Sequence, residues 1–190
     1  MQKNASDLEL RQLLNPANVL TVSRLVLLPP LIVALTRREG VAAAVLMLVV
    51  WGTDLVDGWL ARRLGTAGPQ GQTIDTLVDF TVIFGLFVAA YASGLIPAYQ
   101  FLIICGLKLV TFLLQLSTLA ARHFRVIATH LSKLAGALAY AYAMLLVAIL
   151  LTGPLPPMQL AQTVIFVLLA LAIAANATEC AFGVCARPRP

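Results

Sequence analysis

Four aspartates fall close together in residues 54–79, which read DLVDGWLARRLGTAGPQGQTIDTLVD. The chain holds eight acidic residues in all, so half of them lie in this one stretch. Both flanks are strongly apolar, and a carboxylate inside a membrane costs at least about 2.5–3.5 kcal/mol on insertion scales. Four neighbouring carboxylates would also repel one another. The cluster therefore needs compensating positive charge, and bound divalent cations would supply it.

The composition around this stretch is that of a membrane protein. Of 190 residues, 61% are hydrophobic and only 11% are charged, about half the charged fraction of a soluble domain. A helix needs roughly 20 apolar residues to cross a bilayer. Runs of about this length occur at residues 18–36, 41–64, 73–96, 99–122, 131–152 and 158–181. We therefore expect an all-α integral membrane protein with six transmembrane helices, the first kinked at Pro29-Pro30.

The predicted organisation is one membrane domain with short ends. Residues 18–182 form the six-helix domain, and residues 183–190 form a C-terminal tail. Residues 1–17 form a juxtamembrane segment. They are too polar for a cleaved signal peptide, and their spaced leucines predict a short amphipathic helix at the membrane surface.

Basic residues predict the orientation in the membrane. With the N-terminus inside, the cytoplasmic side receives Lys3, Arg11, Arg62, Arg63, Arg122, Arg125, Lys133, Arg187 and Arg189. The other side receives only Arg37 and Arg38. This asymmetry predicts that both termini and the aspartate cluster are on the cytoplasmic side. From the compact architecture we expect a plasma membrane of prokaryotic type. The net charge of +5 suits anionic lipid headgroups, and no aromatic-interleaved basic patch predicts a nucleic-acid partner.

Helical spacing brings the aspartates together in pairs. Asp54 and Asp57 are three residues apart on one helix, and Asp75 and Asp79 are four apart on the next, so each pair shares a face. The short connection at residues 65–72 predicts antiparallel neighbouring helices whose pairs converge. Ligation by oxygen alone favours Mg²⁺ or Mn²⁺. Two such ions held by four carboxylates are suited to polarising a diphosphate.

The small and basic residues near the aspartates suit an anionic ligand. Gly58 and Ala61 remove bulk on the Asp54 face, where a ligand can approach the backbone. Arg62 offers a planar set of donors that matches phosphate. Gly68 and Gly71 permit loop conformations in which backbone N–H groups face an anion.

The full pattern is Asp54-x2-Asp57-Gly58-x2-Ala61-Arg62-x8-Gly71-x3-Asp75-x3-Asp79. It matches, position for position, the signature of the CDP-alcohol phosphatidyltransferases, a family that the chain resembles over most of its length. The resemblance implies transfer of a phosphatidyl group from CDP-diacylglycerol to a small polar alcohol, with release of CMP. It implies that two divalent cations are held by Asp54, Asp57, Asp75 and Asp79. It also implies that Asp79 acts as general base and that the protein is a homodimer. The residues implied to contact the CDP donor are Gly58, Ala61, Arg62, Gly68 and Gly71.

The start of the first span is similar to the phosphatidylglycerophosphate synthase branch, in the pattern Asn15-Pro16-Ala17-Asn18-x-Leu20-Thr21-x2-Arg24-Leu25. We therefore expect glycerol 3-phosphate as the acceptor. Basic residues that would surround its phosphate are Arg24, Lys108, Arg122, Arg125, His130 and Lys133. Thr76 and Phe80 stand where that branch usually has proline and lysine, so inositol phosphate, serine or another alcohol stays open.

Two other classes of function fit an acidic cluster in a membrane. A membrane prenyltransferase also uses aspartates and Mg²⁺ on a diphosphate, but its motifs lie on separated helices and its product is pyrophosphate. A cation transporter would use the carboxylates as an ion site, but it gives no role to the Gly58, Ala61 and Arg62 face.

Overall fold

The structure is a computed structural model that describes residues 16–63, 69–120, 124–126, 130–182 and 186–188. Side chains are described for residues 20–56, 63, 76–116 and 130–182. The predicted interfacial helix of the N-terminal segment falls mainly in residues 1–15, outside the described residues, and stays a prediction.

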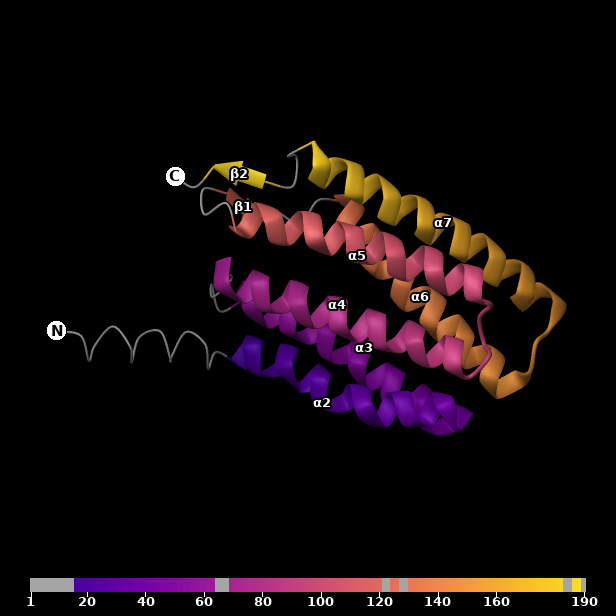
Figure 1. The fold of residues 1–190 in the computed structure, drawn as a ribbon. Helices are drawn as coiled ribbons and strands as arrows, with labels where there is room; N and C mark the ends of the chain where they lie inside the picture. Colours follow the sequence, from indigo (N-terminus) through magenta and orange to yellow (C-terminus); the bar gives the residue numbers. More distant parts are fainter. Residues whose placement is uncertain (1–15, 64–68, 121–123, 127–129, 183–185, 189–190) are drawn as a thin grey trace.

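The described residues form six helices connected in an up-and-down arrangement (Figure 1). They are α2 (Pro16–Thr36), α3 (Gly40–Arg63), α4 (Pro69–Ala92), α5 (Ala98–Ala120), α6 (His130–Thr152) and α7 (Pro156–Ala181). Each predicted span therefore corresponds to a helix. The largest difference is in α4, which begins and ends about four residues earlier than predicted.

The turn chemistry explains that difference. Pro69 begins α4 because its fixed φ suits the first helical turn and its missing N–H is not needed there. The chain then turns at Gly94, whose φ of 70° lies in the left-handed region that glycine favours. The apolar Leu95 and Ile96 extend the hydrophobic run in the sequence but lie beyond the helix.

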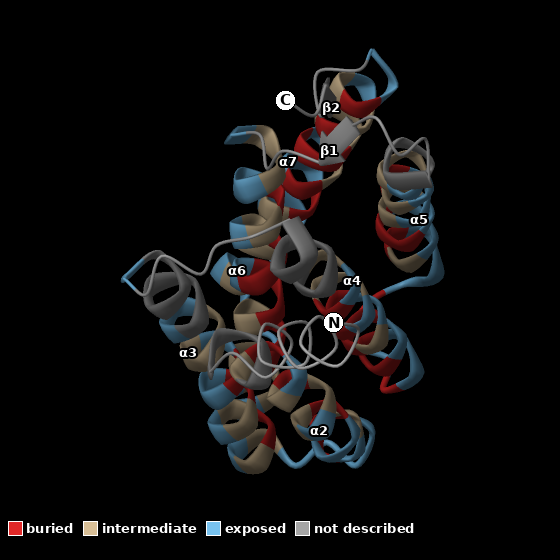
Figure 2. Ribbon diagram, turned by 90° about the vertical axis from the view of Figure 1, so that its left-hand side faces the viewer, coloured by how far each residue is buried: buried red, intermediate tan, exposed pale blue. Residues whose placement is uncertain are grey.

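The helices pack as two groups of three. In the first group, α2 lies against both α3 and α4, whereas direct packing between α3 and α4 is slight within the described residues. In the second group, α7 lies against α5 and α6. Contacts of α6 with α3 and α4, and of α5 with α4, join the groups. Buried residues face the bundle interior (Figure 2).

The outer faces of the bundle are apolar. Side chains such as Val26, at 72% exposure, and Leu160, at 68%, have no protein cover, which is the pattern expected of a surface solvated by lipid. Three helical stretches are long and apolar enough to cross a membrane, namely Ala98–Leu116, His130–Thr152 and Pro156–Ala181. The described apolar stretches of α2, α3 and α4 are shorter. The length and composition of these helices agree with the predicted membrane protein, and the number of spans stays a prediction.

Two short strands add to the predicted helical fold. β1 (Phe124–Val126), between α5 and α6, pairs antiparallel with β2 (Ala186–Pro188), within the predicted C-terminal tail. Arg125 lies opposite Arg187 in this ribbon. We call the end of the bundle with β1 and β2 the ribbon end; α2, α4 and α6 begin at this end (Figure 1).

The opposite end, which we call the turn end, contains the connections after α2, α4 and α6. Arg38 donates from Nε and Nη2 to the Ser93 carbonyl, at 3.2 and 2.6 Å. This contact ties the turn after α2 to the end of α4. Tyr142 of α6 donates to Gln100 Oε1 of α5 at 2.6 Å. Each of these hydrogen bonds therefore joins two helices of the same group at the turn end.

Candidate active site

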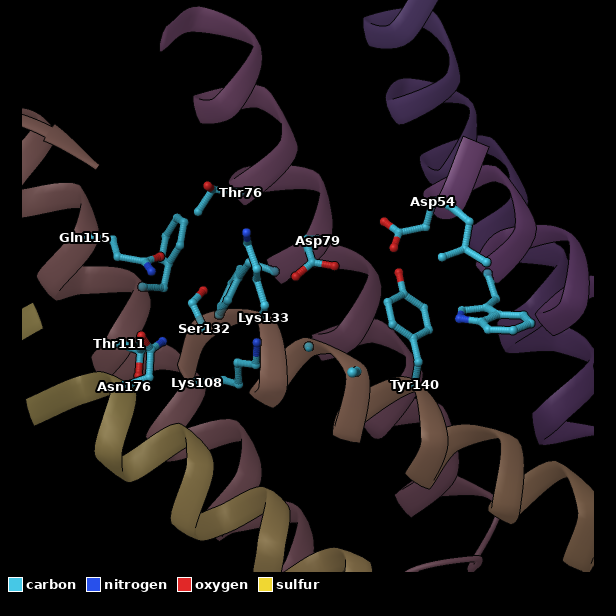
Figure 3. A pocket seen from close by; sticks show the side chains of 16 residues that line it. Asp54, Thr76, Asp79, Lys108, Thr111, Gln115, Ser132, Lys133, Tyr140 and Asn176 are labelled. Carbon is cyan, nitrogen blue, oxygen red and sulfur yellow. The ribbon is translucent and has the colours of Figure 1, made fainter. Parts of the chain in front are cut away.

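A cavity of about 360 Å³ lies between the two helix groups, in the half of the bundle toward the ribbon end. Helices α3 to α7 all contribute to its wall (Figure 3). The lining residues are Trp51, Asp54, Leu55, Thr76, Asp79, Phe80, Lys108, Thr111, Phe112, Gln115, Ser132, Lys133, Gly136, Ala137, Tyr140 and Asn176. The cavity therefore joins parts of the sequence as far apart as residues 51 and 176.

Two of the four predicted metal-binding aspartates face this cavity, and one of them, Asp79, is also the predicted general base. Asp54 comes from α3 and Asp79 from α4, and the Tyr140 hydroxyl points toward both carboxylates (Figure 3). α2 separates much of α3 from α4 while contacting both. The expected convergence of the two helices thus takes the form of carboxylates that share a cavity, without close packing of the backbones.

Arg24 of α2 is the ion-pair partner of Asp54. Its side chain is fully buried, and Nη1 donates to the Asp54 carboxylate, which remains 31% exposed. A buried arginine needs such a partner because desolvating an unpaired charge is expensive. Arg24 does not line the cavity, so the structure places this predicted acceptor contact behind Asp54.

Asp57 and Asp75 lie one turn from the two cavity aspartates, since α3 and α4 are helical across them. Their side chains are outside the described residues. Among the side chains that the structure describes, no three acidic, histidine or cysteine groups come together. The donor set nevertheless fits divalent metal, because the cavity presents carboxylate oxygens from two helices and each helix carries a second aspartate nearby.

The predicted donor contacts lie at the ribbon-end edge of the site. Gly58, Ala61 and Arg62 occupy the last turns of α3, and Gly71 lies in the first turn of α4. The structure therefore puts Gly71 on a helix, where a loop was expected. Side chains of this group are not among those described, and Gly68 lies outside the described residues.

Lys108 of α5 and Lys133 of α6 line the cavity beyond Asp79, away from Asp54 (Figure 3). They are the two predicted acceptor residues that the structure brings into the cavity. Arg122 lies outside the described residues. Arg125 belongs to β1, where its side chain is not described, and His130 begins α6 outside the cavity lining.

Several cavity residues were missed by the sequence reasoning. Thr111 and Gln115 were not predicted, although they share a face of α5 with the predicted Lys108 at intervals of three and four residues. Asn176 is a buried polar residue in an otherwise apolar stretch of α7 and lies near Thr111 (Figure 3). A single polar residue within an apolar helix is expected to face the bundle interior, so the sequence did contain a signal for Asn176.

Phe80 belongs to an aromatic wall of the cavity. Its ring stacks on Phe112 of α5 with centroids 4.3 Å apart, and on Phe84 one turn along α4 at 5.6 Å. Phe80 therefore closes the gap between α4 and α5, at the position where the related branch usually has lysine. The positive charge of the cavity comes instead from Lys108 and Lys133.

Comparison with known proteins agrees with this geometry. The family model of the CDP-alcohol phosphatidyltransferases matches residues 14–179. The chain belongs to this family. The CDP-alcohol phosphatidyltransferase motif thus contributes two described carboxylates to the cavity, and the family predicted from residues 54–79 is confirmed.

Relatives of the predicted branch are among the matches. A probable phosphatidylglycerophosphate synthase of Mycobacterium tuberculosis (strain H37Rv) is 31% identical over 112 residues, covering 55% of this chain and 53% of the relative. A CDP-diacylglycerol–glycerol-3-phosphate 3-phosphatidyltransferase of Aquifex aeolicus is 31% identical over 71 residues, covering 37% and 40%. The matches therefore span about half of these curated relatives or less.

Proposed function

We propose that this CDP-alcohol phosphatidyltransferase transfers a phosphatidyl group from CDP-diacylglycerol to glycerol 3-phosphate and releases CMP. One observation carries the proposal: a single cavity contains Asp54 and Asp79 and, beyond Asp79, Lys108 and Lys133. The carboxylates suit metal and proton chemistry, and the lysines suit a phosphate dianion. Family membership and the names of the two relatives support the same reaction.

The acidic part of the cavity would receive the donor diphosphate. We propose that Asp54, Asp57, Asp75 and Asp79 hold two Mg²⁺ or Mn²⁺ ions. When bound, these ions would polarise the diphosphate and balance the charge of the leaving CMP. Arg24 would keep the Asp54 carboxylate in place through its buried ion pair. Gly58, Ala61, Arg62, Gly68 and Gly71 would contact the CDP portion.

The basic part of the cavity would orient the acceptor. Lys108 and Lys133 would bind its phosphate, which leaves the hydroxyl directed back toward Asp79. Asp79 accepts the proton of that hydroxyl as general base. The alcohol oxygen then bonds to the lipid-bearing phosphorus, and the bond from that phosphorus to the CMP oxygen breaks.

The same proposal includes an arrangement in the membrane. Six helices would span the bilayer, with the ribbon end, both termini and the active site on the cytoplasmic side of a prokaryotic-type plasma membrane. The donor's tails would stay in the bilayer while cytidine and acceptor enter from the cytoplasm. The exposed apolar faces would contact lipid or a second copy in a homodimer.

The first prediction tests the reaction directly. Purified protein is given CDP-diacylglycerol, Mg²⁺ or Mn²⁺, and in turn glycerol 3-phosphate, inositol phosphate, serine or glycerol, and CMP release is measured. We expect metal-dependent release with glycerol 3-phosphate. Asp79→Asn keeps the size of the side chain but weakens the base, so kcat should fall by about 10²–10⁴-fold.

The outcomes separate the alternatives. Release with another acceptor keeps the chemistry and changes the substrate. Pyrophosphate release from a prenyl diphosphate, or cation flux in vesicles without CMP release, would replace the proposal with another class of protein. Equal kcat for wild type and Asp79→Asn would remove Asp79 as the base.

A further inference from the structure

Tyr140 carries a buried polar atom that the proposed mechanism does not yet use. The residue is 6% exposed and lines the cavity from α6. Within the described residues, its hydroxyl oxygen makes no hydrogen bond of normal geometry. Buried tyrosine hydroxyls are normally hydrogen-bonded. Tyr142 illustrates the usual case two residues later, because its hydroxyl donates to Gln100.

The Tyr140 hydroxyl points into the most acidic part of the cavity. In Figure 3 the Asp54 carboxylate lies above the hydroxyl and the Asp79 carboxylate lies beside it. Both carboxylates are close enough to interact with it electrostatically, and the Arg24 guanidinium is close enough to donate a hydrogen bond to its oxygen, which would leave the O–H proton available to a ligand. Arg24 is already the ion-pair partner of Asp54. The hydroxyl is therefore a neutral O–H donor placed close to two carboxylates from different helices.

This position is where the transferred phosphate must lie. The phosphorus has to be within reach of an acceptor oxygen whose proton goes to Asp79, and the diphosphate has to reach the metal ligands, which include Asp54. A phosphate between them presents anionic oxygens to the wall formed by Tyr140. Donors aimed at such oxygens stabilise the charge that develops as the new bond forms.

We propose that Tyr140 is a further catalytic residue whose hydroxyl donates a hydrogen bond to a non-bridging oxygen of the phosphate that is transferred. The inference rests on the proposed function. Tyr140 keeps its proton throughout. Asp79 accepts the proton of the alcohol, the alcohol oxygen bonds to phosphorus, and CMP leaves with the electrons of the broken P–O bond.

The test compares Tyr140→Phe with Tyr142→Phe in the full-length protein. Both changes remove one hydroxyl oxygen from a buried tyrosine of α6, but only Tyr140 lines the cavity. For Tyr140→Phe we expect kcat to fall roughly 10²-fold, the size typical of losing one transition-state donor. The Kd for CDP-diacylglycerol and the Tm should change little. For Tyr142→Phe, kcat should be retained and Tm should fall, because Gln100 loses its donor.

A sulfur-substituted donor adds a readout that a structural role would not change. CDP-diacylglycerol with sulfur at one non-bridging position of the lipid-bearing phosphate is prepared as two diastereomers. For the diastereomer with sulfur facing Tyr140, wild type should lose rate, and Tyr140→Phe should show a smaller loss. For the other diastereomer, the two proteins should show the same ratio of oxygen to sulfur rates.

Each outcome decides the inference. Unchanged kcat in Tyr140→Phe overturns it. A lower kcat together with a lower Tm and equal sulfur effects in both proteins also overturns it, because that combination indicates a structural role. If wild type releases no CMP with any acceptor, the proposed function fails first, and this inference fails with it. Active wild type with an unaffected Tyr140→Phe removes the inference alone.

Discussion

At the scale of single residues, the cavity separates two kinds of charge over a short distance. Asp54 is partly exposed and backed by the buried Arg24, so its carboxylate is held from outside the cavity. Lys108 and Lys133 come from the other helix group and line the cavity directly. The diphosphate of the proposed donor would match the first part of the cavity, and the phosphate of the proposed acceptor would match the second. The lysines are thus where acceptor preference should be decided.

The lysines give a prediction about acceptor binding. In Lys133→Gln and Lys108→Gln, the KM for glycerol 3-phosphate should rise roughly ten- to a hundredfold, because a charge-assisted hydrogen bond contributes about 1.5–3 kcal/mol. The KM for CDP-diacylglycerol should stay the same. Steady-state CMP release at varied acceptor concentration measures the change. The control is Arg37→Gln, which also removes one positive charge but at the turn end, and which should leave the acceptor KM unchanged. A lysine whose loss leaves the acceptor KM unchanged does not bind the acceptor.

At the scale of elements, a glycine allows α2 and α4 to approach closely. A Cβ at Gly85 of α4 would lie 3.1–3.2 Å from the Leu28 side chain of α2. Gly106 of α5 faces open space, with nothing within 4 Å of such a Cβ. The first glycine therefore sets a helix-to-helix distance, and the second does not.

This contrast predicts opposite effects of the same substitution. Gly85→Leu should lower the free energy of unfolding by about 1–3 kcal/mol, the usual range for overpacking. Because it would displace Leu28 of α2, it should also weaken the packing that holds Arg24, one turn away on α2, in place. Gly106→Leu should be neutral or stabilising, since leucine has the higher helix propensity. Thermal unfolding in detergent compares the two, and equal Tm values would show that the α2–α4 contact is not tight.

The elements also show what the sequence can predict. Pairs such as Gly153 and Pro156 interrupt the apolar runs, so the helix bounds follow from local chemistry, and the shift of α4 traces to Pro69 and Gly94. The pairing of β1 with β2 joins residues more than 50 positions apart and leaves no periodic signal in three-residue strands. Placing Asn176 and Tyr140 in the cavity likewise required knowing which turns of α6 and α7 face α3 and α4. The local sequence pattern does not determine how each helix is rotated about its own axis in the bundle.

At the scale of the whole molecule, the bundle has one end rich in candidate functional groups and one end held by polar contacts. The ribbon end contains the cavity and the parts of α3 and α4 that carry the aspartate motif. Arg38, Ser93 and the Tyr142–Gln100 hydrogen bond lie toward the other. The orientation predicted from charge would place the first end in the cytoplasm.

Opposite ends of α7 test that orientation. Leu155 precedes α7 at the turn end, and Phe182 follows it at the ribbon end, with both side chains exposed. In a variant with the native cysteines changed to serine, Leu155→Cys should react with a membrane-impermeant maleimide on intact cells. Phe182→Cys should react only after permeabilisation. Equal labelling of both without permeabilisation would show that α7 does not cross the membrane in this way.

The two consecutive prolines of α2 have a mechanical consequence. Pro29 and Pro30 have no N–H, so the carbonyls of Leu25 and Val26 lose the donors that an unbroken helix would give them. Bending stiffness is lowest where adjacent hydrogen bonds are missing. α2 is therefore most easily bent at Pro29 and Pro30. On one side of this point residues such as Leu31 are packed into the core, and on the other side Arg24 forms its ion pair with Asp54, so a bend at the prolines would change the position of the ion pair relative to that core.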